Sequence, residues 1–169
     1  ENSDDSSKWE FLKWQYSLNH LGKEIHMCME GYCSAYIYWY LKRFYGLMGD
    51  TDKRSPTSEG EITKNGYIMA HYAQYATETT RIKAVINNEE VCATAYLDEK
   101  TGEVTIVLLN LNGASQWLEI PLAGIKKASA VETNETKNME VIDTGLMESA
   151  EGITVLLSAN SITSVRLTF

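Results

Sequence analysis

Apolar residues recur in steps of three and four between residues 10 and 29. They are Phe11, Trp14, Leu18, Leu21, Ile25 and Met29. Such spacing places side chains along one stripe of an α-helix. Acidic and hydroxyl residues at 4–7 suit the start of that helix, and Gly31 suits its end. The pattern therefore predicts one amphipathic helix over residues 10–29.

The next segment, "SAYIYWYLKRFYG", carries an unbroken apolar run over residues 35–41. The run has no polar alternation and is rich in Tyr and Ile, which predicts a strand buried on both faces, as in a parallel sheet covered by helices. A helix of equal length is the alternative. Residues 46–62 hold Gly, Asp, Ser and Pro and predict an exposed loop. A second helix is expected over 64–76, with Thr63 as its N-cap; its inward side carries Ile68, Tyr72, Tyr75 and Ala76.

After Thr80 the pattern changes to short strands separated by turn residues. The stretch "EEVCATAYLDEKTGEVTIVLLNLNG" predicts a hairpin that turns at residues 99–102. Further strands are predicted at 116–120, 125–133, 140–143, 153–157 and 162–169. The last of these places Val165 and Leu167 on one face and Arg166 on the other. Short strands of this kind are typical of an antiparallel β-sandwich.

The chain is therefore expected to combine an α/β part, residues 1–79, with an all-β part, residues 80–169. One strand between two helices cannot complete a parallel sheet. The missing strands would come from upstream sequence or from a companion chain. The first residues, "ENSDDSSKWEF", lack Met, a basic region and an apolar region, so we expect further sequence before them.

Composition narrows the classes of partner. Of the 169 residues, 44% are hydrophobic and 22% are charged, as in a folded globular protein. The net charge of -8 argues against a nucleic-acid partner. No apolar run approaches the ~20 residues of a membrane helix. The three cysteines, Cys28, Cys33 and Cys92, favour buried free thiols; a Cys28–Cys33 bridge would need a tight turn between them.

Trp39, Arg43 and Tyr45 are the candidate binding residues. Sugar clefts use flat rings and a few polar groups, and the planar fork of arginine suits a carboxylate. In parallel barrels such groups lie at the ends of strands. Taken alone, however, Trp39 is more typical of a core, Arg43 of a salt bridge and Tyr45 of packing.

Three segments carry a resemblance to a known family. "GKEIHMCM", "SAYIYWYLKRFYGLMGD" and "GEITKNGYIMAHYAQYA", in this order, resemble the closing part of glycoside hydrolase family 30, and most closely its glucuronoxylanase branch. The resemblance is strong over residues 22–76; beyond them it rests on the layout of the strands and the ending "NSITSVRLTF". It implies the C-terminal fragment of a TIM (β/α)8 barrel (helix 7, strand 8 and helix 8), followed by a side β-sandwich. It also implies an extracellular, secreted protein.

The resemblance assigns roles to the candidate residues. Trp39 matches the Trp that forms the floor of the −1 sugar subsite in the family. Arg43 and Tyr45 fall on the pair that holds the methylglucuronate branch of xylan. Two positions depart from the pattern: Tyr38 stands where the family usually has Trp, and Asn65 where it usually has Arg.

A retaining glycosidase also needs two carboxyl groups about 5–5.5 Å apart. The barrel strand that carries the acid/base is not in this chain. Glu1 is only a remote candidate nucleophile and reads more simply as a loop residue beyond it. We expect neither a metal nor a cofactor. His20, His26 and His71 lack metal spacing, the pair Glu59 and Glu61 reads as solvated, and Asp50 with Asp52 resembles a calcium loop only loosely.

The expected function is thus the C-terminal part of a retaining endo-β-1,4-xylanase that recognises glucuronate branches. Its partners would be glucuronoxylan and the missing N-terminal portion of the barrel, with no nucleic acid and no membrane. One alternative is another family 30 β-glycosidase, similar to glucosylceramidases. Others are a carbohydrate-binding sandwich with Trp117 as its platform, although a lone Trp in a strand is usually core, and a sandwich that only braces the barrel.

Overall fold

The computed structural model describes residues 12–142, 146–149 and 151–169. Glu1, the expected helix start at residues 4–7 and Phe11 lie outside the described residues.

The first predicted helix is confirmed in its described part. It comprises α1 (Trp14–Ser17), a π-helical turn (Leu18–Gly22) and α2 (Lys23–Glu30) without interruption. Four residues of the predicted stripe are buried: Trp14, Leu18, Leu21 and Ile25. The apolar spacing thus identified the face that packs against the rest of the molecule.

The second helix, α3 (Lys64–Ala73), begins at the predicted residue and ends three residues earlier than predicted. Thr63 is its N-cap: the hydroxyl accepts a hydrogen bond from the Gly66 amide at 3.1 Å and donates to the Gly46 carbonyl at 2.7 Å. Ile68 and Tyr72 are buried, as expected. The threonine therefore satisfies a free amide of the first turn and ties the helix to the preceding loop.

The all-β part forms two antiparallel sheets. The larger has six strands in the order β1-β2-β3-β9-β5-β6. Their bounds are Thr80–Ile82 (β1), Val91–Leu97 (β2), Val104–Asn110 (β3), Lys127–Thr133 (β5), Glu140–Val141 (β6) and Ser161–Thr168 (β9). The smaller has the order β4-β8-β7, with bounds Gln116–Ile120 (β4), Leu146–Ser149 (β7) and Gly152–Leu157 (β8). The predicted sandwich strands and the hairpin turn at 99–102 are present, whereas β1 and β7 were not predicted.

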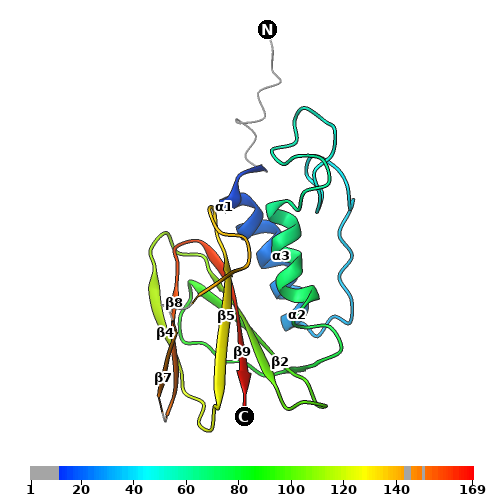
Figure 1. Cartoon of the computed structure of the whole chain (residues 1–169). Coiled ribbons are helices and arrows are strands. Elements are labelled where there is room, and N and C mark those ends of the chain that lie inside the picture. Colours follow the sequence, from blue (N-terminus) through cyan, green and yellow to red (C-terminus); the bar gives the residue numbers. More distant parts are fainter. Residues whose placement is uncertain (1–11, 143–145, 150) are drawn as a thin grey trace.

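Three layers build the described molecule: the helices, the six-stranded sheet and the three-stranded sheet (Figure 1). Alternate residues of β3 serve different cores, because Val107 and Leu109 pack against the helices while Ile106 and Leu108 face the smaller sheet. The six-stranded sheet therefore has one hydrophobic core against the helices and a second against the smaller sheet. The division of the chain at residues 79 and 80 stays a prediction.

The prediction of a doubly buried strand over residues 35–41 is wrong for this chain. The segment runs along the outer side of the helices without entering a sheet (Figure 1). Tyr36 and Tyr38 pack against the helical core, but Ile37 is 91% exposed, Trp39 69% and Leu41 64%. A strand needs neighbours for its amide and carbonyl groups. The described residues place no paired strand beside this run, and its last carbonyl, that of Leu41, accepts from the Met48 amide at 2.8 Å. Within the described part, no helix is long and apolar enough to cross a bilayer.

Candidate functional site

The three predicted binding residues lie together, joined by a fourth residue that sequence reasoning missed. The ring of Trp39 lies beside that of Tyr40, with centroids 4.4 Å apart, and Tyr40 meets Tyr45 edge-on at 6.3 Å. The guanidinium of Arg43 lies over both tyrosines, 5.1 Å from the Tyr40 centroid and 5.9 Å from that of Tyr45. We call these four residues, Trp39, Tyr40, Arg43 and Tyr45, the aromatic–arginine cluster.

The backbone at Tyr40 explains how the cluster forms. Successive side chains of an extended segment point to opposite sides. Tyr40 has a left-handed conformation, with φ of 62°, which breaks this alternation, so its ring can lie beside that of Trp39. A side chain other than glycine adopts this conformation at some energetic cost. No pattern of residue types predicted the turn.

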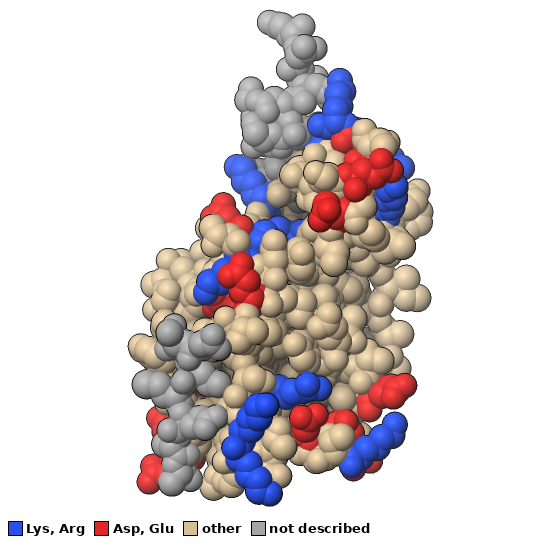
Figure 2. All heavy atoms as spheres, in the orientation of Figure 1, with Lys and Arg blue, Asp and Glu red and all other residues tan. Residues whose placement is uncertain are grey.

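Arg43 is exposed, and no described acidic side chain forms an ion pair with it. The neighbouring cations are engaged: Lys42 Nζ lies 2.6 Å from Glu59, and Arg54 pairs with Asp52 at 2.5 Å. Hydrogen bonds from Arg54, and more weakly the charge of Arg43, hold the pKa of Asp52 below its ordinary value. Charged side chains of both signs gather over this loop region (Figure 2). The Arg43 guanidinium is thus in contact with two aromatic rings and forms no ion pair with a described acidic side chain.

The two departures from the family pattern contact each other beneath the cluster. Tyr38 donates its hydroxyl to the Tyr45 carbonyl at 2.9 Å. Asn65, from the first turn of α3, donates to the same carbonyl at 3.0 Å and to the Tyr38 hydroxyl at 3.2 Å. Burial raises the pKa of the Tyr38 phenol, while the hydrogen bond from Asn65 acts in the opposite direction. Together these side chains fix the backbone that carries Tyr45.

A cavity of about 410 Å³ lies between this segment and the first helix. Tyr38, Phe44 and Tyr45 line it on one side, and Tyr16, His20 and Glu24 are among the helical residues on the other. Tyr45 is therefore half-buried and contributes to two environments, the cavity and the exposed cluster.

The other candidate groups are the acidic residues Glu1, Asp50 and Asp52. Glu1 lies outside the described residues, so its assignment stays a prediction. Asp50 and Asp52 form a turn in which the Asp52 amide donates to Asp50 Oδ1 at 3.0 Å. The guanidinium of Arg54 donates to both carboxylate oxygens of Asp52. That geometry differs from a calcium loop. Across the described ranges, no three His, Cys, Asp or Glu side chains are grouped so as to hold a metal ion.

Two polar side chains anchor α3: the buried His71, and the half-buried Lys64, which sequence reasoning missed. His71 is fully buried, with Nδ1 2.8 Å from the Ser164 hydroxyl and Nε2 2.9 Å from the Thr133 hydroxyl. Burial lowers its pKa to about 3. Lys64 donates from Nζ to three oxygens of the loop after β5: Asn134 O at 2.6 Å, Lys137 O at 2.9 Å and Asn138 Oδ1 at 2.7 Å. Both residues lie on the same helical stripe as Ile68, and that spacing was the available signal.

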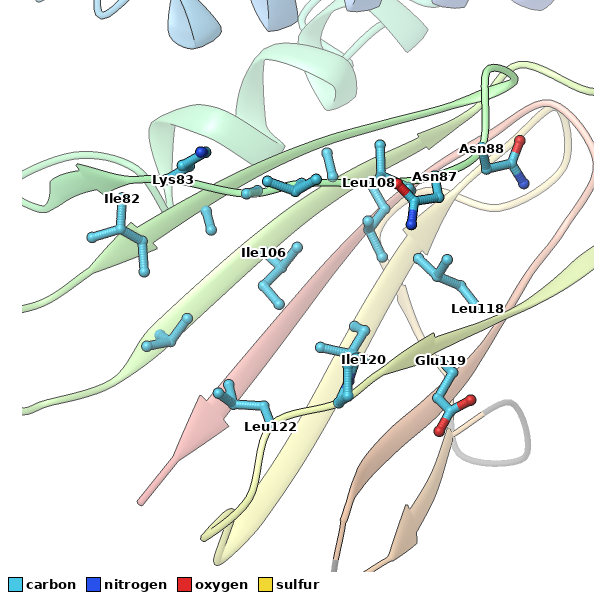
Figure 3. Close-up of a pocket in the computed structure, with 17 residues that line it drawn as sticks. Ile82, Lys83, Asn87, Asn88, Ile106, Leu108, Leu118, Glu119, Ile120 and Leu122 are labelled. Carbon is cyan, nitrogen blue, oxygen red and sulfur yellow. The ribbon is translucent and has the colours of Figure 1, made fainter.

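The sandwich contains a larger cavity, of about 870 Å³, between the segment that follows β1 and strands β3 and β4 (Figure 3). Its lining is mainly aliphatic and includes Ile82, Ile106, Leu108, Leu118 and Ile120, with no aromatic ring. The cavity therefore offers no aromatic surface on which a sugar could stack, although it exceeds the space beside the cluster.

Trp117 on β4 is 51% exposed, which contradicts the expectation of a core tryptophan. It belongs to the outward-facing set of an alternating strand, in which Leu118 and Ile120 point inward. A single exposed ring on the outer face of the smaller sheet remains as the alternative platform.

Comparisons with known proteins agree with this architecture. The chain is 30% identical over 168 residues to a glucuronoxylanase, XynC, of Bacillus subtilis strain 168; the match covers 96% of this chain and 36% of the relative. The structure superimposes on a family 30 subfamily 8 xylanase, Xyn30A, from Clostridium acetobutylicum, with a TM-score of 0.79 at 22% identity, covering 94% of this chain and 40% of that one. For xylanase C from Talaromyces cellulolyticus the TM-score is 0.79 at 17% identity, covering 94% and 37%. No protein-family profile matches the chain.

The relatives that the chain matches are glycoside hydrolases by name, and the chain spans little more than a third of their length. Within this class, the resemblance predicted from the motifs is confirmed: the chain is similar to the C-terminal portion of family 30 glucuronoxylanases. The likeness to the solved structures concerns the fold.

Proposed function

We propose that the chain is the C-terminal portion of a retaining endo-β-1,4-xylanase that acts on glucuronoxylan. The aromatic–arginine cluster would hold the glucuronate branch. The supporting observation is the exposed Arg43 guanidinium, which lies over the rings of Tyr40 and Tyr45 and has no ion-pair partner among the described acidic residues. Similarity to glucuronoxylanases supports the choice of polysaccharide.

In this proposal each residue of the cluster has a separate task. The ring of Trp39 supplies a flat apolar surface for a xylose unit. The fork of Arg43 donates two parallel hydrogen bonds to the carboxylate of the branch, and the phenol of Tyr45 donates a third. The tyrosines beneath Arg43 hold its charge in place by cation–π contact.

The segment over residues 35–41 would be the last strand of a TIM barrel, flanked by α2 and α3. Its inner tyrosines already pack against these helices, whereas Ile37 and Leu41 stay exposed, as expected for a strand whose neighbours are supplied elsewhere. The rest of the barrel would provide the acid/base and the nucleophile. Such an enzyme would act outside the cell, where its polysaccharide lies.

The test is the variant Arg43→Ala in the longer enzyme. On glucuronoxylan, kcat/KM should fall by the equivalent of about 2–5 kcal/mol, the range for truncating one member of a hydrogen-bonded charge pair. On undecorated xylo-oligosaccharides, which lack the carboxylate, kcat/KM should change little. Trp39→Ala should impair both substrates.

Lys42→Ala is the matched control, because it removes an adjacent positive charge that is already paired with Glu59. It should leave the preference for glucuronoxylan intact. Equal turnover of glucuronoxylan by Arg43→Ala and the unaltered enzyme would contradict the proposed role. Loss of polysaccharide binding on Trp117→Ala alone would favour the sandwich-binding alternative instead.

A further inference from the structure

Helix α2 ends in a turn that brings two cysteines together. The amide of Cys33 donates to the carbonyl of Cys28 at 2.9 Å, and the amide of Tyr32 donates to that of Met29 at 3.2 Å. Tyr32 is left-handed, with φ of 58°. These two bonds and the left-handed residue between them define a Schellman turn, in which the side chains of the first and last residues characteristically touch. Here both of those residues are cysteines.

The backbone distance permits a covalent link. A carbonyl oxygen lies about 2.4 Å from its own Cα, and an amide nitrogen about 1.5 Å from its own. With a hydrogen bond of 2.9 Å between them, the Cα atoms of Cys28 and Cys33 are at most about 6.8 Å apart. Disulfides join Cα atoms separated by about 4.4–6.8 Å. The tight turn that a bridge between these residues would need is therefore present.

Location in the fold distinguishes this pair from the third cysteine. Cys33 is exposed and Cys28 half-buried, so the expectation of buried thiols is wrong. Burial raises the pKa of the Cys28 thiol, and the adjacent Cys33 thiol raises it further. Cys92, on β2, is half-buried against the helical core. Burial also raises the pKa of the Cys92 thiol.

We propose that Cys28 and Cys33 form a redox-active dithiol, a modification site that a low-molecular-weight disulfide such as oxidised glutathione converts to an intrachain bridge. The exposed Cys33 thiolate attacks the glutathione disulfide, forms a mixed disulfide and releases one glutathione thiolate. The Cys28 thiolate then attacks the Cys33 sulfur and releases the second. Two protein thiols are oxidised, one glutathione disulfide is reduced to two thiols, and the two protons pass to the released thiolates.

The bridge would fix the end of α2 to the start of the extended segment that carries Trp39. Cys33, Ser34 and Tyr36 line a cavity of about 470 Å³ together with Met29 and Tyr72, so small reagents have access to the turn. In an oxidising environment the bridged form would persist.

The test uses the full chain with Cys92→Ser, which retains the pair alone. After incubation with oxidised glutathione, intact mass should show the loss of two hydrogen atoms with no retained glutathione, and peptide mapping should join Cys28 to Cys33. Formation should accelerate as pH rises, because thiolate is the attacking species, and dithiothreitol should reverse it. The oxidised form should melt at a higher temperature than the reduced form.

The control is Cys33→Ser/Cys92→Ser, which leaves Cys28 alone and should give at most a glutathione adduct. Differential alkylation of the unaltered chain provides a second measurement that needs no variant. Three outcomes would each overturn the proposal: two retained glutathione adducts, a dimer linked between chains, or Cys28 and Cys33 both still open to alkylation after oxidation.

Discussion

At the residue scale, the most informative contact is the one between Tyr38 and Asn65. The family pattern has a larger aromatic ring and a cation at these positions, and neither departure stands out when the sequence is considered one position at a time. The structure shows that both side chains donate to one acceptor, the carbonyl of Tyr45, and also bond to each other. The two departures are thus a coupled pair that supports a proposed binding residue.

This coupling yields a prediction about stability. Tyr38→Phe or Asn65→Ala alone leaves one donor on the Tyr45 carbonyl, so each should lower the free energy of unfolding by about 0.5–1.5 kcal/mol. The double variant leaves that half-buried carbonyl without either donor. Its loss should exceed the sum of the single losses by about 0.5 kcal/mol or more. Urea unfolding of the four proteins at one pH measures the difference.

Tyr36→Phe is the control for this cycle, because its hydroxyl donates to the exposed Glu24 carboxylate at 3.0 Å and makes no contact with Asn65. Its effect should add to that of Asn65→Ala. Simple additivity of Tyr38→Phe and Asn65→Ala would show that the shared carbonyl does not couple them.

At the scale of elements, α3 is the part that ties the helices to the sandwich. Lys64 and His71 are seven residues apart and therefore lie on one face of the helix, with Ile68 between them. The lysine contacts the loop after β5, and the histidine contacts β5 and β9. Polar anchors at both ends of an apolar contact fix the register of the helix on the sheet as well as its distance from it.

The buried histidine predicts a pH-dependent stability. Burial lowers the pKa of His71 to about 3, below its value of about 6.5 in an unfolded chain. Between these values the unfolded state binds the extra proton, so stability is fully present above pH 6.5 and falls as pH is lowered towards 3, by at most about 1.4 kcal/mol per unit. Burial also lowers the pKa of His26, so the two effects add.

The variant His71→Gln separates the contribution of His71 to this pH dependence from that of His26. It should be less stable than the unaltered chain at pH 7 by about 1–3 kcal/mol, because one hydroxyl partner is left unsatisfied. The difference should shrink between pH 6.5 and 5, since glutamine does not titrate. A constant difference between His71→Gln and the unaltered chain across this range would contradict the assignment.

The elements that the sequence predicted well are those specified by local pattern. The stripe of Trp14, Leu18 and Ile25 and the hairpin of β2 and β3 needed no distant information. The strand β1 was missed because three residues carry too little pattern to be recognised. The segment over residues 35–41 was assigned to a buried strand because its composition suits one, but a strand forms only where other strands pair with it.

At the scale of the whole molecule, the candidate site also combines features set by local sequence with features that depend on distant contacts. Resemblance identified Trp39, Arg43 and Tyr45, and the structure places them in one cluster. The resemblance did not identify Tyr40, whose role depends on a left-handed backbone. Nor did it identify the support of the Tyr45 carbonyl by Tyr38 and Asn65. In the proposed barrel, the catalytic carboxylates would lie outside the described residues.

The exposed side of the 35–41 segment offers a test of the proposed barrel. Ile37 and Leu41 contact mainly water in this chain, being 91% and 64% exposed. The variant Ile37→Ala/Leu41→Ala should therefore change the free energy of unfolding of the 169-residue chain by no more than about 0.5 kcal/mol per site. In the longer enzyme, neighbouring barrel strands would bury both side chains. The same variant should then lose about 2–5 kcal/mol per site, as for large-to-small changes in a core.

Val85, also exposed at 74% but outside the segment, supplies the control for this comparison. Val85→Ala tests whether the longer enzyme is simply more sensitive to loss of an apolar side chain, and it should be tolerated in both proteins. Urea unfolding of each pair gives the values directly. A small effect of Ile37→Ala/Leu41→Ala in both proteins would mean that no strand packs against this segment, and the barrel assignment would fail with it. A large effect confined to the longer enzyme would show that additional strands bury the exposed side of the segment there, as the closed barrel requires.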